Sequence, residues 1–127
     1  MGVKVMCVDD SATIRKLVQK ALQPAGFDVV EAENGRVALA SSDASIDIFI
    51  VDVHMPEMDG FEYVAAIRKN PELAGKPVIF LTTESSEVKK SQGKELGAKG
   101  WIVKPFKPED LTNVARILTG GNHADKG

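Results

Sequence analysis

The chain has 127 residues, 43% of them hydrophobic, which is long enough to bury the core of one domain. Its 16 Lys and Arg against 18 Asp and Glu give a formal net charge of -2, so no basic surface for nucleic acid is expected. No apolar run approaches the roughly 18 residues that span a bilayer, and the single cysteine, Cys7, lies inside an apolar run, as expected in a reducing compartment. We therefore expect a monomeric cytoplasmic domain that neither binds nucleic acid nor enters a membrane.

Short apolar runs rich in β-branched residues recur along the chain and predict strands. These runs cover residues 3–8, 28–31, 46–51, 77–81 and 101–103. Most of them lack strict alternation of apolar and polar residues, which is typical of parallel strands that are buried on both faces.

Longer segments with helical spacing separate these runs. The apolar stripe of the first segment consists of Ile14, Leu17, Val18, Ala21 and Leu22. Ser11 stands where a helix N-cap is expected. Further helices are predicted at residues 35–42, 60–69 and 109–118, the last entered through Pro108, because proline is favourable at the start of a helix.

The segment between Glu84 and Glu95 predicts a helix that is weakly held. Val88 is its only apolar residue, and Gly93 lowers its helix propensity further. A helix with so little apolar surface to bury is the one that we expect to move most easily.

Alternating strands and helices predict an α/β fold, with a five-stranded parallel sheet covered by five helices on both faces. We place the domain at residues 1–120. The polar residues 121–127, which include His123, are expected to form a disordered tail.

Polar side chains directly follow four of the five predicted strands. They are Asp9 and Asp10, Asp52, Thr82 and Thr83, and Lys104. In a parallel α/β sheet the carboxyl ends of the strands meet at one edge, where ligands of such sheets bind. A lone aspartate after a strand is most often a turn or cap residue, so the joint occurrence is what indicates a site.

The chemistry of these side chains fits a divalent cation and a phosphoryl group. The adjacent carboxylates of Asp9 and Asp10 need a compensating charge, and Mg²⁺ prefers such oxygen ligands. Asp52 stands alone after a central strand and is our candidate nucleophile toward phosphorus, with the ammonium of Lys104 stabilising the charge. The sequence contains no nucleotide-binding glycine loop, so the donor is expected to be another protein or a small molecule.

Four stretches together resemble the receiver domain of two-component response regulators. They are "VDDS" at 8–11, "VDVHMPEMDG" at 51–60, "LTTES" at 81–85 and "GWIVKPF" at 100–106. The last two are most similar to the single-domain, CheY-like chemotaxis branch. The resemblance runs from about residue 3 to residue 118 and leaves no room for a DNA-binding output domain.

The resemblance implies a role for each residue of the acidic site. Asp52 would be the phosphoacceptor, and Asp9, Asp10, Asp52 and the backbone carbonyl of His54 would hold Mg²⁺. Lys104 would pair with the phosphoryl oxygens. The family also implies a flavodoxin-like sheet of order 2-1-3-4-5.

The resemblance also assigns a switch. Thr82 would turn its hydroxyl toward the phosphoryl group, and Trp101 would be the switch aromatic, in place of the usual Tyr or Phe. His54, Thr83 and Glu84 flank the acceptor and would tune the rate at which the phosphate is lost. A cis bond before Pro105 is implied as well.

By this resemblance the protein is a phosphorylation-switched regulator of chemotaxis and not a turnover enzyme, although slow autodephosphorylation is expected. The donor would be a phosphohistidine on a chemotaxis histidine kinase. The output would be the flagellar motor switch or another protein target, and a separate phosphatase is a possible further partner. A role as a phosphate sink for a shared kinase is equally compatible with the sequence.

The rival from a different class is a metal-dependent phosphatase or phosphotransferase of the aspartyl-phosphate type, such as the haloacid dehalogenase-like enzymes. Their D-x-D-x-T motif is missing after Asp52, where Val53 and His54 follow. A flavodoxin-like flavin binder is disfavoured because no phosphate-binding loop is present and acids stand where an anion would bind.

Overall fold

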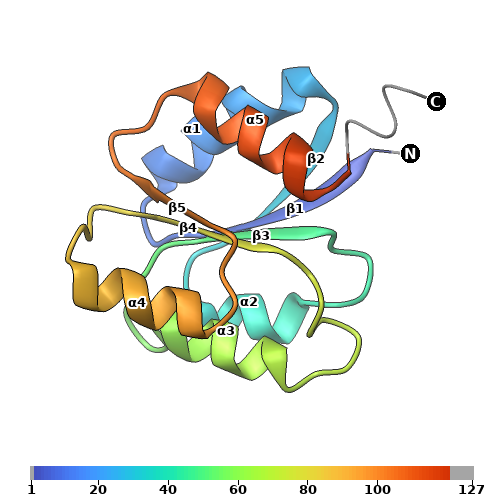
Figure 1. Ribbon diagram of the computed structural model, residues 1–127. Helices are drawn as coiled ribbons and strands as arrows, with labels where there is room; N and C mark the ends of the chain where they lie inside the picture. The colour runs from blue at the N-terminus through green and yellow to red at the C-terminus, as the bar shows by residue number, and fades with distance from the viewer. Residues whose placement is uncertain (1, 121–127) are drawn as a thin grey trace.

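The computed structural model describes residues 2–120 and shows a parallel sheet between two layers of helices (Figure 1). The five strands are β1 (Val3–Val8), β2 (Phe27–Ala32), β3 (Ile48–Val51), β4 (Val78–Thr82) and β5 (Gly100–Val103). They pair in the order β2-β1-β3-β4-β5, and every pairing is parallel. This confirms the sheet implied by the resemblance. The tail expected at residues 121–127, with His123, lies outside the described residues.

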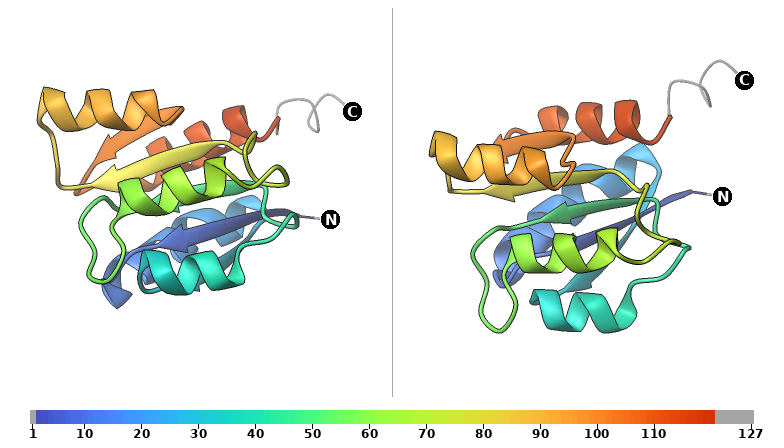
Figure 2. Two further views of the ribbon diagram at one scale, coloured as in Figure 1. Left: turned by 90° about the horizontal axis from the view of Figure 1, so that it is seen from below. Right: turned by 60° about the horizontal axis from the view of Figure 1, so that its bottom comes forward.

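The helices cover both faces of the sheet. They are α1 (Ala12–Leu22), α2 (Gly35–Ser41), α3 (Gly60–Arg68), α4 (Glu87–Glu95) and α5 (Pro108–Leu118), and a short 3-10 turn, η1 (Gln23–Ala25), follows α1. Figures 1 and 2 show α1 and α5 on one side of the sheet and α2, α3 and α4 on the other. None of these helices is long and apolar enough to cross a membrane.

Each strand contributes to a core on both faces because successive side chains point in opposite directions. In β1, Val5 and Cys7 pack in the cluster under α1 and α5, whereas Met6 and Val8 pack in the cluster on the opposite face. Every residue of β3 and β4 is buried, as the unbroken apolar runs predicted. Burial also raises the pKa of the Cys7 thiol, which therefore stays protonated.

Several predicted boundaries were wrong by a few residues. β3 begins at Ile48 and not at Ile46, because the Ile46 amide donates to the Asp43 carbonyl (3.1 Å) and closes a turn before the strand. Thr82 is the last residue of β4 rather than the residue after it. Helix α4 begins only at Glu87, so the first three residues of the predicted segment belong to the preceding loop.

Helix starts follow from their caps. Ser11 accepts a hydrogen bond from the Ile14 amide (3.2 Å), which confirms it as the N-cap of α1. Asp59 and Glu62 form a reciprocal capping box at α3. We did not predict this box, although its spacing, an acid three residues after an aspartate, is visible in the sequence.

Glu57 has a left-handed backbone, with a φ of 72°, between β3 and α3. A residue other than Gly, Asn or Asp costs roughly 1 kcal/mol of stability in this conformation. The exposed ion pair of Glu57 with Arg36 (3.3 Å) stabilises the fold only slightly. We expect Glu57→Asn to raise the free energy of unfolding by about 0.5 kcal/mol, because asparagine tolerates this conformation. Urea unfolding measures this, with Arg36→Ala as the control for the ion pair. A loss in Glu57→Asn equal to that in Arg36→Ala would show that the ion pair dominates.

Candidate functional site

The two buried carboxylates of the site follow neighbouring strands. Val8 of β1 and Val51 of β3 are register partners, so Asp9 and Asp52 come next to each other at the carboxyl edge of the sheet. The Asp52 amide donates to the Val8 carbonyl (2.9 Å), which continues the ladder by one bond. Asp9 is 2% exposed and Asp52 7% exposed.

Asp10 completes an acidic cluster with these two residues. It is exposed, and one carboxylate oxygen from each of Asp9, Asp10 and Asp52 lies within 4.8 Å of the others. Beside them is an open depression of about 410 Å³, whose lining includes Asp10, His54 and Asp59. The cluster is therefore open to solvent through Asp10, whereas Asp9 and Asp52 lie beneath the surface.

Lys104 lies between the two buried acids. Its Nζ donates to Asp9 Oδ2 (2.8 Å) and to Asp52 Oδ2 (3.2 Å), and its side chain is only 11% exposed. Its amide donates to the Thr82 carbonyl (2.9 Å), which fixes the start of the loop after β5. We expected Mg²⁺ to compensate the acid pair, and the structure shows that the lysine already supplies part of that charge.

The charge of the site remains unbalanced. Burial raises the pKa of Asp9, against the opposing hydrogen bonds from Lys104 and the Ser11 amide. Burial alone would lower the pKa of Lys104, but the hydrogen bond and charge of Asp9 and the charge of Asp52 outweigh it and raise that pKa, so the ammonium persists. Three carboxylates against one ammonium leave a negative site whose oxygen donors fit Mg²⁺.

Gly60 explains why α3 can begin so close to the acceptor strand. A Cβ at this position would lie 2.0 Å from the Asp52 carbonyl oxygen, and the Gly60 amide donates to the Val53 carbonyl (2.9 Å). Any side chain would push Asp52 out of place. From the sequence, Gly60 was predicted only to start a helix.

Arg15 is a further residue that sequence reasoning missed. Its Nη1 donates to the Asp9 carbonyl (2.6 Å) and its Nε to Glu31 Oε1 (2.8 Å), so it ties the start of α1 to the end of β2. This positions the backbone from which the acid pair projects. An arginine one turn into a helix has no sequence signal that separates it from a surface arginine.

The expected switch residue Thr82 and the residues expected to tune the rate lie at the end of β4 and in the loops after β3 and β4. Thr82 is fully buried and its Oγ1 accepts from the Glu84 amide (3.2 Å), so the hydroxyl serves its own loop and not the acidic cluster. Thr83 is exposed. The His54 ring Nε2 lies 2.8 Å from Glu84 Oε1, which lowers the pKa of that carboxyl; His54 and Glu84 therefore form a bridge between the loops after β3 and β4.

Trp101 is turned inward. Its Nε1 donates to the Glu84 carbonyl (2.9 Å), and its ring lies 5.4 Å from that of Phe80 and 6.4 Å from that of Phe61 between centroids. The indole N–H therefore has the partner that an inward tryptophan requires. The peptide bond between Lys104 and Pro105 is cis, as the resemblance implied.

The arrangement defines a class of protein: a parallel α/β domain with an acidic, lysine-bridged site at its carboxyl edge. The sequence matches the response regulator receiver domain over residues 5–116. The chain therefore belongs to this family, whose members are phosphorylation-switched regulators and not ordinary turnover enzymes.

The chain is similar to chemotaxis proteins and to one domain of a sensor histidine kinase. The chain is 35% identical over 123 residues to chemotaxis protein CheY1 of Helicobacter pylori, covering 94% of this chain and 99% of that protein. It is 34% identical over 115 residues to the sensor histidine kinase CheAY of the same organism, covering 88% of this chain and 14% of the kinase. Chemotaxis protein CheY4 of Vibrio cholerae has a similar structure, with a TM-score of 0.85 at 45% identity, covering 93% of this chain and 99% of that one.

Proposed function

We propose that this receiver domain is a phosphorylation-switched response regulator of chemotaxis signalling that accepts a phosphoryl group on Asp52. One observation carries the proposal: the Asp52 carboxylate lies 3.2 Å from the ammonium of Lys104 and beside two further carboxylates. A nucleophile, a charge to stabilise the transferring group and a cation site are the parts that phosphoryl transfer requires.

In the reaction, an oxygen of Asp52 attacks the phosphorus of the donor in line. An O–P bond to Asp52 forms while the P–N bond of a phosphohistidine breaks, and the leaving imidazole takes up a proton from solvent. Asp52 needs no general base because a carboxylate attacks in its ionised form. The Lys104 ammonium pairs with one equatorial oxygen of the transferring phosphoryl group and stabilises the negative charge on it. Asp9, Asp10, Asp52 and the His54 carbonyl would hold Mg²⁺, which supplies further neutralisation of the phosphoryl charge when bound.

The switch begins at Thr82. At present the Thr82 hydroxyl accepts a hydrogen bond from the Glu84 amide. A phosphoryl group on Asp52 would draw this hydroxyl toward itself and away from that amide. Because the Glu84 carbonyl holds Trp101, a change in this loop reaches the aromatic ring and then α4. We propose that α4, β5 and α5 form the surface that a protein partner binds. The bridge between His54 and Glu84 would control access to the phosphoryl group.

The assignment to chemotaxis is supported by relatives that carry that name and that are covered over almost their whole length. A histidine kinase as donor is supported by the kinase in which a domain similar to this chain occurs. By this proposal the output is a protein contact, such as one at the flagellar motor switch, and a phosphatase is a further candidate partner.

The proposal is tested by intact mass after incubation with acetyl phosphate, with Mg²⁺ or with EDTA. We expect one added phosphoryl group per chain that requires Mg²⁺, and slow return to the starting mass after the donor is removed. Continuous consumption of excess donor would instead favour an aspartyl-phosphate phosphatase, and no mass gain would refute the proposal.

We expect the backbone amides of α4 to exchange with solvent at least about tenfold faster than those of α1. Gly93 is the only buried residue of α4, and Val88 is 69% exposed, so little apolar burial opposes local opening of this helix. Hydrogen exchange measured by mass spectrometry compares the two helices directly. Equal protection would contradict the idea that α4 is the movable element.

A further inference from the structure

Gly93 lies in the middle of α4, where glycine is among the least favourable residues for a helix. A Cβ built at this position would lie 2.8 Å from Cζ3 of Trp101, well inside the separation that real Cβ atoms adopt. It would also lie 3.2 Å from Cδ2 of Phe80. The missing side chain therefore leaves the space that the six-membered ring of Trp101 fills.

Trp101 contacts the region of α4 at two points. Its ring fills the space at Gly93 in the middle of the helix, and its Nε1 bonds the Glu84 carbonyl in the loop that leads into the helix. The Glu84 amide in turn donates to Thr82 Oγ1. One residue, Glu84, thus joins the buried hydroxyl beside the acceptor site to the ring under α4.

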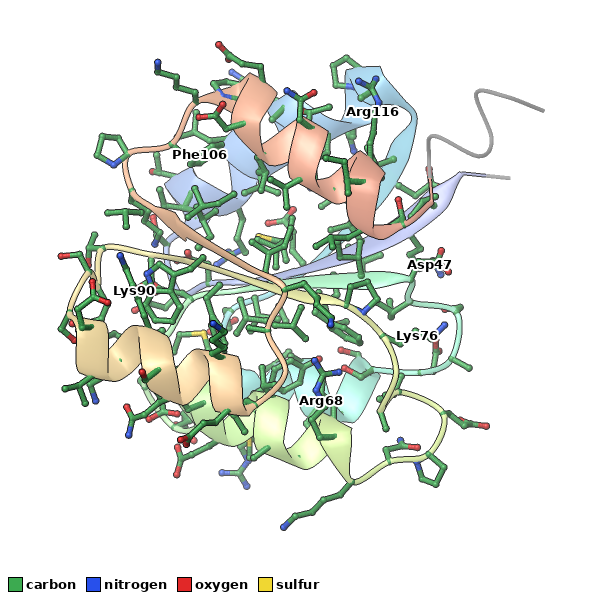
Figure 3. All side chains as sticks on the ribbon, viewed as in Figure 1. Asp47, Arg68, Lys76, Lys90, Phe106 and Arg116 are labelled. Atoms are coloured by element: carbon green, nitrogen blue, oxygen red, sulfur yellow. The ribbon has the colours of Figure 1, made fainter. Side chains whose placement is uncertain are left out.

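The far end of α4 is fixed separately. Arg68, at the end of α3, donates to the carbonyls of Leu96 (2.9 Å) and Gly97 (3.2 Å), which directly follow α4 (Figure 3). In the first turn of the helix Glu87 and Val88 are exposed, and Lys89 is half-buried with its ammonium 5.8 Å from the centroid of the Phe61 ring of α3. The contact of Gly93 with Trp101 therefore lies between the arginine anchor and the more exposed first turn of α4.

We propose that Gly93 is a positioning residue for the switch aromatic: Gly93 and Trp101 are a matched pair that holds the indole inward and seats α4 on the sheet. Displacing the ring would leave an unfilled space beneath α4, so we expect ring and helix to shift together about the anchored end. The part that concerns movement rests on the proposed phosphorylation switch. The matched pair itself does not, because it concerns the resting structure alone.

Stability tests the pair without phosphorylation. Gly93→Ala is expected to lower the urea midpoint of the wild-type protein, although alanine is the better helix former. In the Trp101→Tyr background, which lacks the Cζ3 atom, the same change is expected to be neutral or to raise the midpoint. Gly75→Ala is the control, since a Cβ there meets nothing within 4 Å. The same effect of Gly93→Ala in both backgrounds would overturn the pairing.

Fluorescence tests the position of the ring, because Trp101 is the only tryptophan. In Gly93→Ala we expect red-shifted emission and at least about twofold stronger quenching by acrylamide, while Gly75→Ala keeps the wild-type signal. Unchanged quenching in Gly93→Ala would show that the ring does not depend on the space at Gly93 and would refute the proposal.

Incubation with acetyl phosphate and Mg²⁺ tests the joint movement of ring and helix separately from phosphorylation itself. We expect the emission of the wild-type protein to change together with its mass, and the change to be reduced in Gly93→Ala although its mass gain is retained. A mass gain without any emission change in the wild type would refute the joint movement and leave the phosphorylation switch standing. Absence of a mass gain would refute the proposed function, whereas the stability result would still decide the matched pair.

Discussion

Asp52→Asn is expected to abolish the uptake of a phosphoryl group from acetyl phosphate. The carboxamide has no anionic oxygen to attack phosphorus, and Asp9, the other carboxylate beside Lys104, has both of its oxygens engaged by Lys104 and the Ser11 amide. Intact mass in the presence of Mg²⁺ measures the effect. Retained labelling would place the acceptor on another residue and would remove the observation on which the proposed function depends.

This loss should not come from unfolding. Asparagine has nearly the size of the 7% exposed aspartate, and the variant has one negative charge fewer in a cluster of three carboxylates. We therefore expect its urea midpoint to equal or exceed that of the wild type. Asp28→Asn is the matched control, because Asp28 is exposed near the start of β2, at the opposite edge of the sheet, and should be labelled normally.

The strand-end residues of this site were predictable because parallel topology needs no side-chain detail. Once strands and helices alternate, the residues after β1 and β3 must meet at one edge, and Asp9 and Asp52 do. The strand order itself came from the resemblance. The spacing of apolar runs indicates a parallel sheet but does not say which strands are neighbours.

The contacts of the site were less predictable because they join residues that are far apart in sequence. Lys104 and Asp9 are 95 positions apart, and nothing local shows that the ammonium bridges two acids in the resting state. In the sequence, Gly93 is explained as a residue that weakens its helix, and Trp101 as the aromatic residue that the family resemblance implies. Only the fold shows that the first makes room for the second.

Lys104→Met is expected to lower the rate of phosphorylation by about 10² and to destabilise the protein when Mg²⁺ is absent. The rate falls because a preorganised charge on the transferring group is lost, an effect of this order when one such donor is removed. Stability falls by about 3 kcal/mol because Asp9 and Asp52 become buried carboxylates without a compensating positive charge. Methionine preserves the apolar stem of the side chain, so lost packing contributes little.

Mg²⁺ distinguishes this explanation from a general defect. A divalent cation bound by Asp9, Asp10 and Asp52 would replace the missing charge, so Mg²⁺ should raise the urea midpoint of Lys104→Met more than that of the wild type. Lys107→Met, in the same loop but exposed, should behave as the wild type does. If Lys104→Met were as stable as the wild type in EDTA, the ammonium would not be what compensates the acids. Their mutual repulsion would then have to be relieved by protonation, for which the raised pKa of Asp9 makes that residue the first candidate.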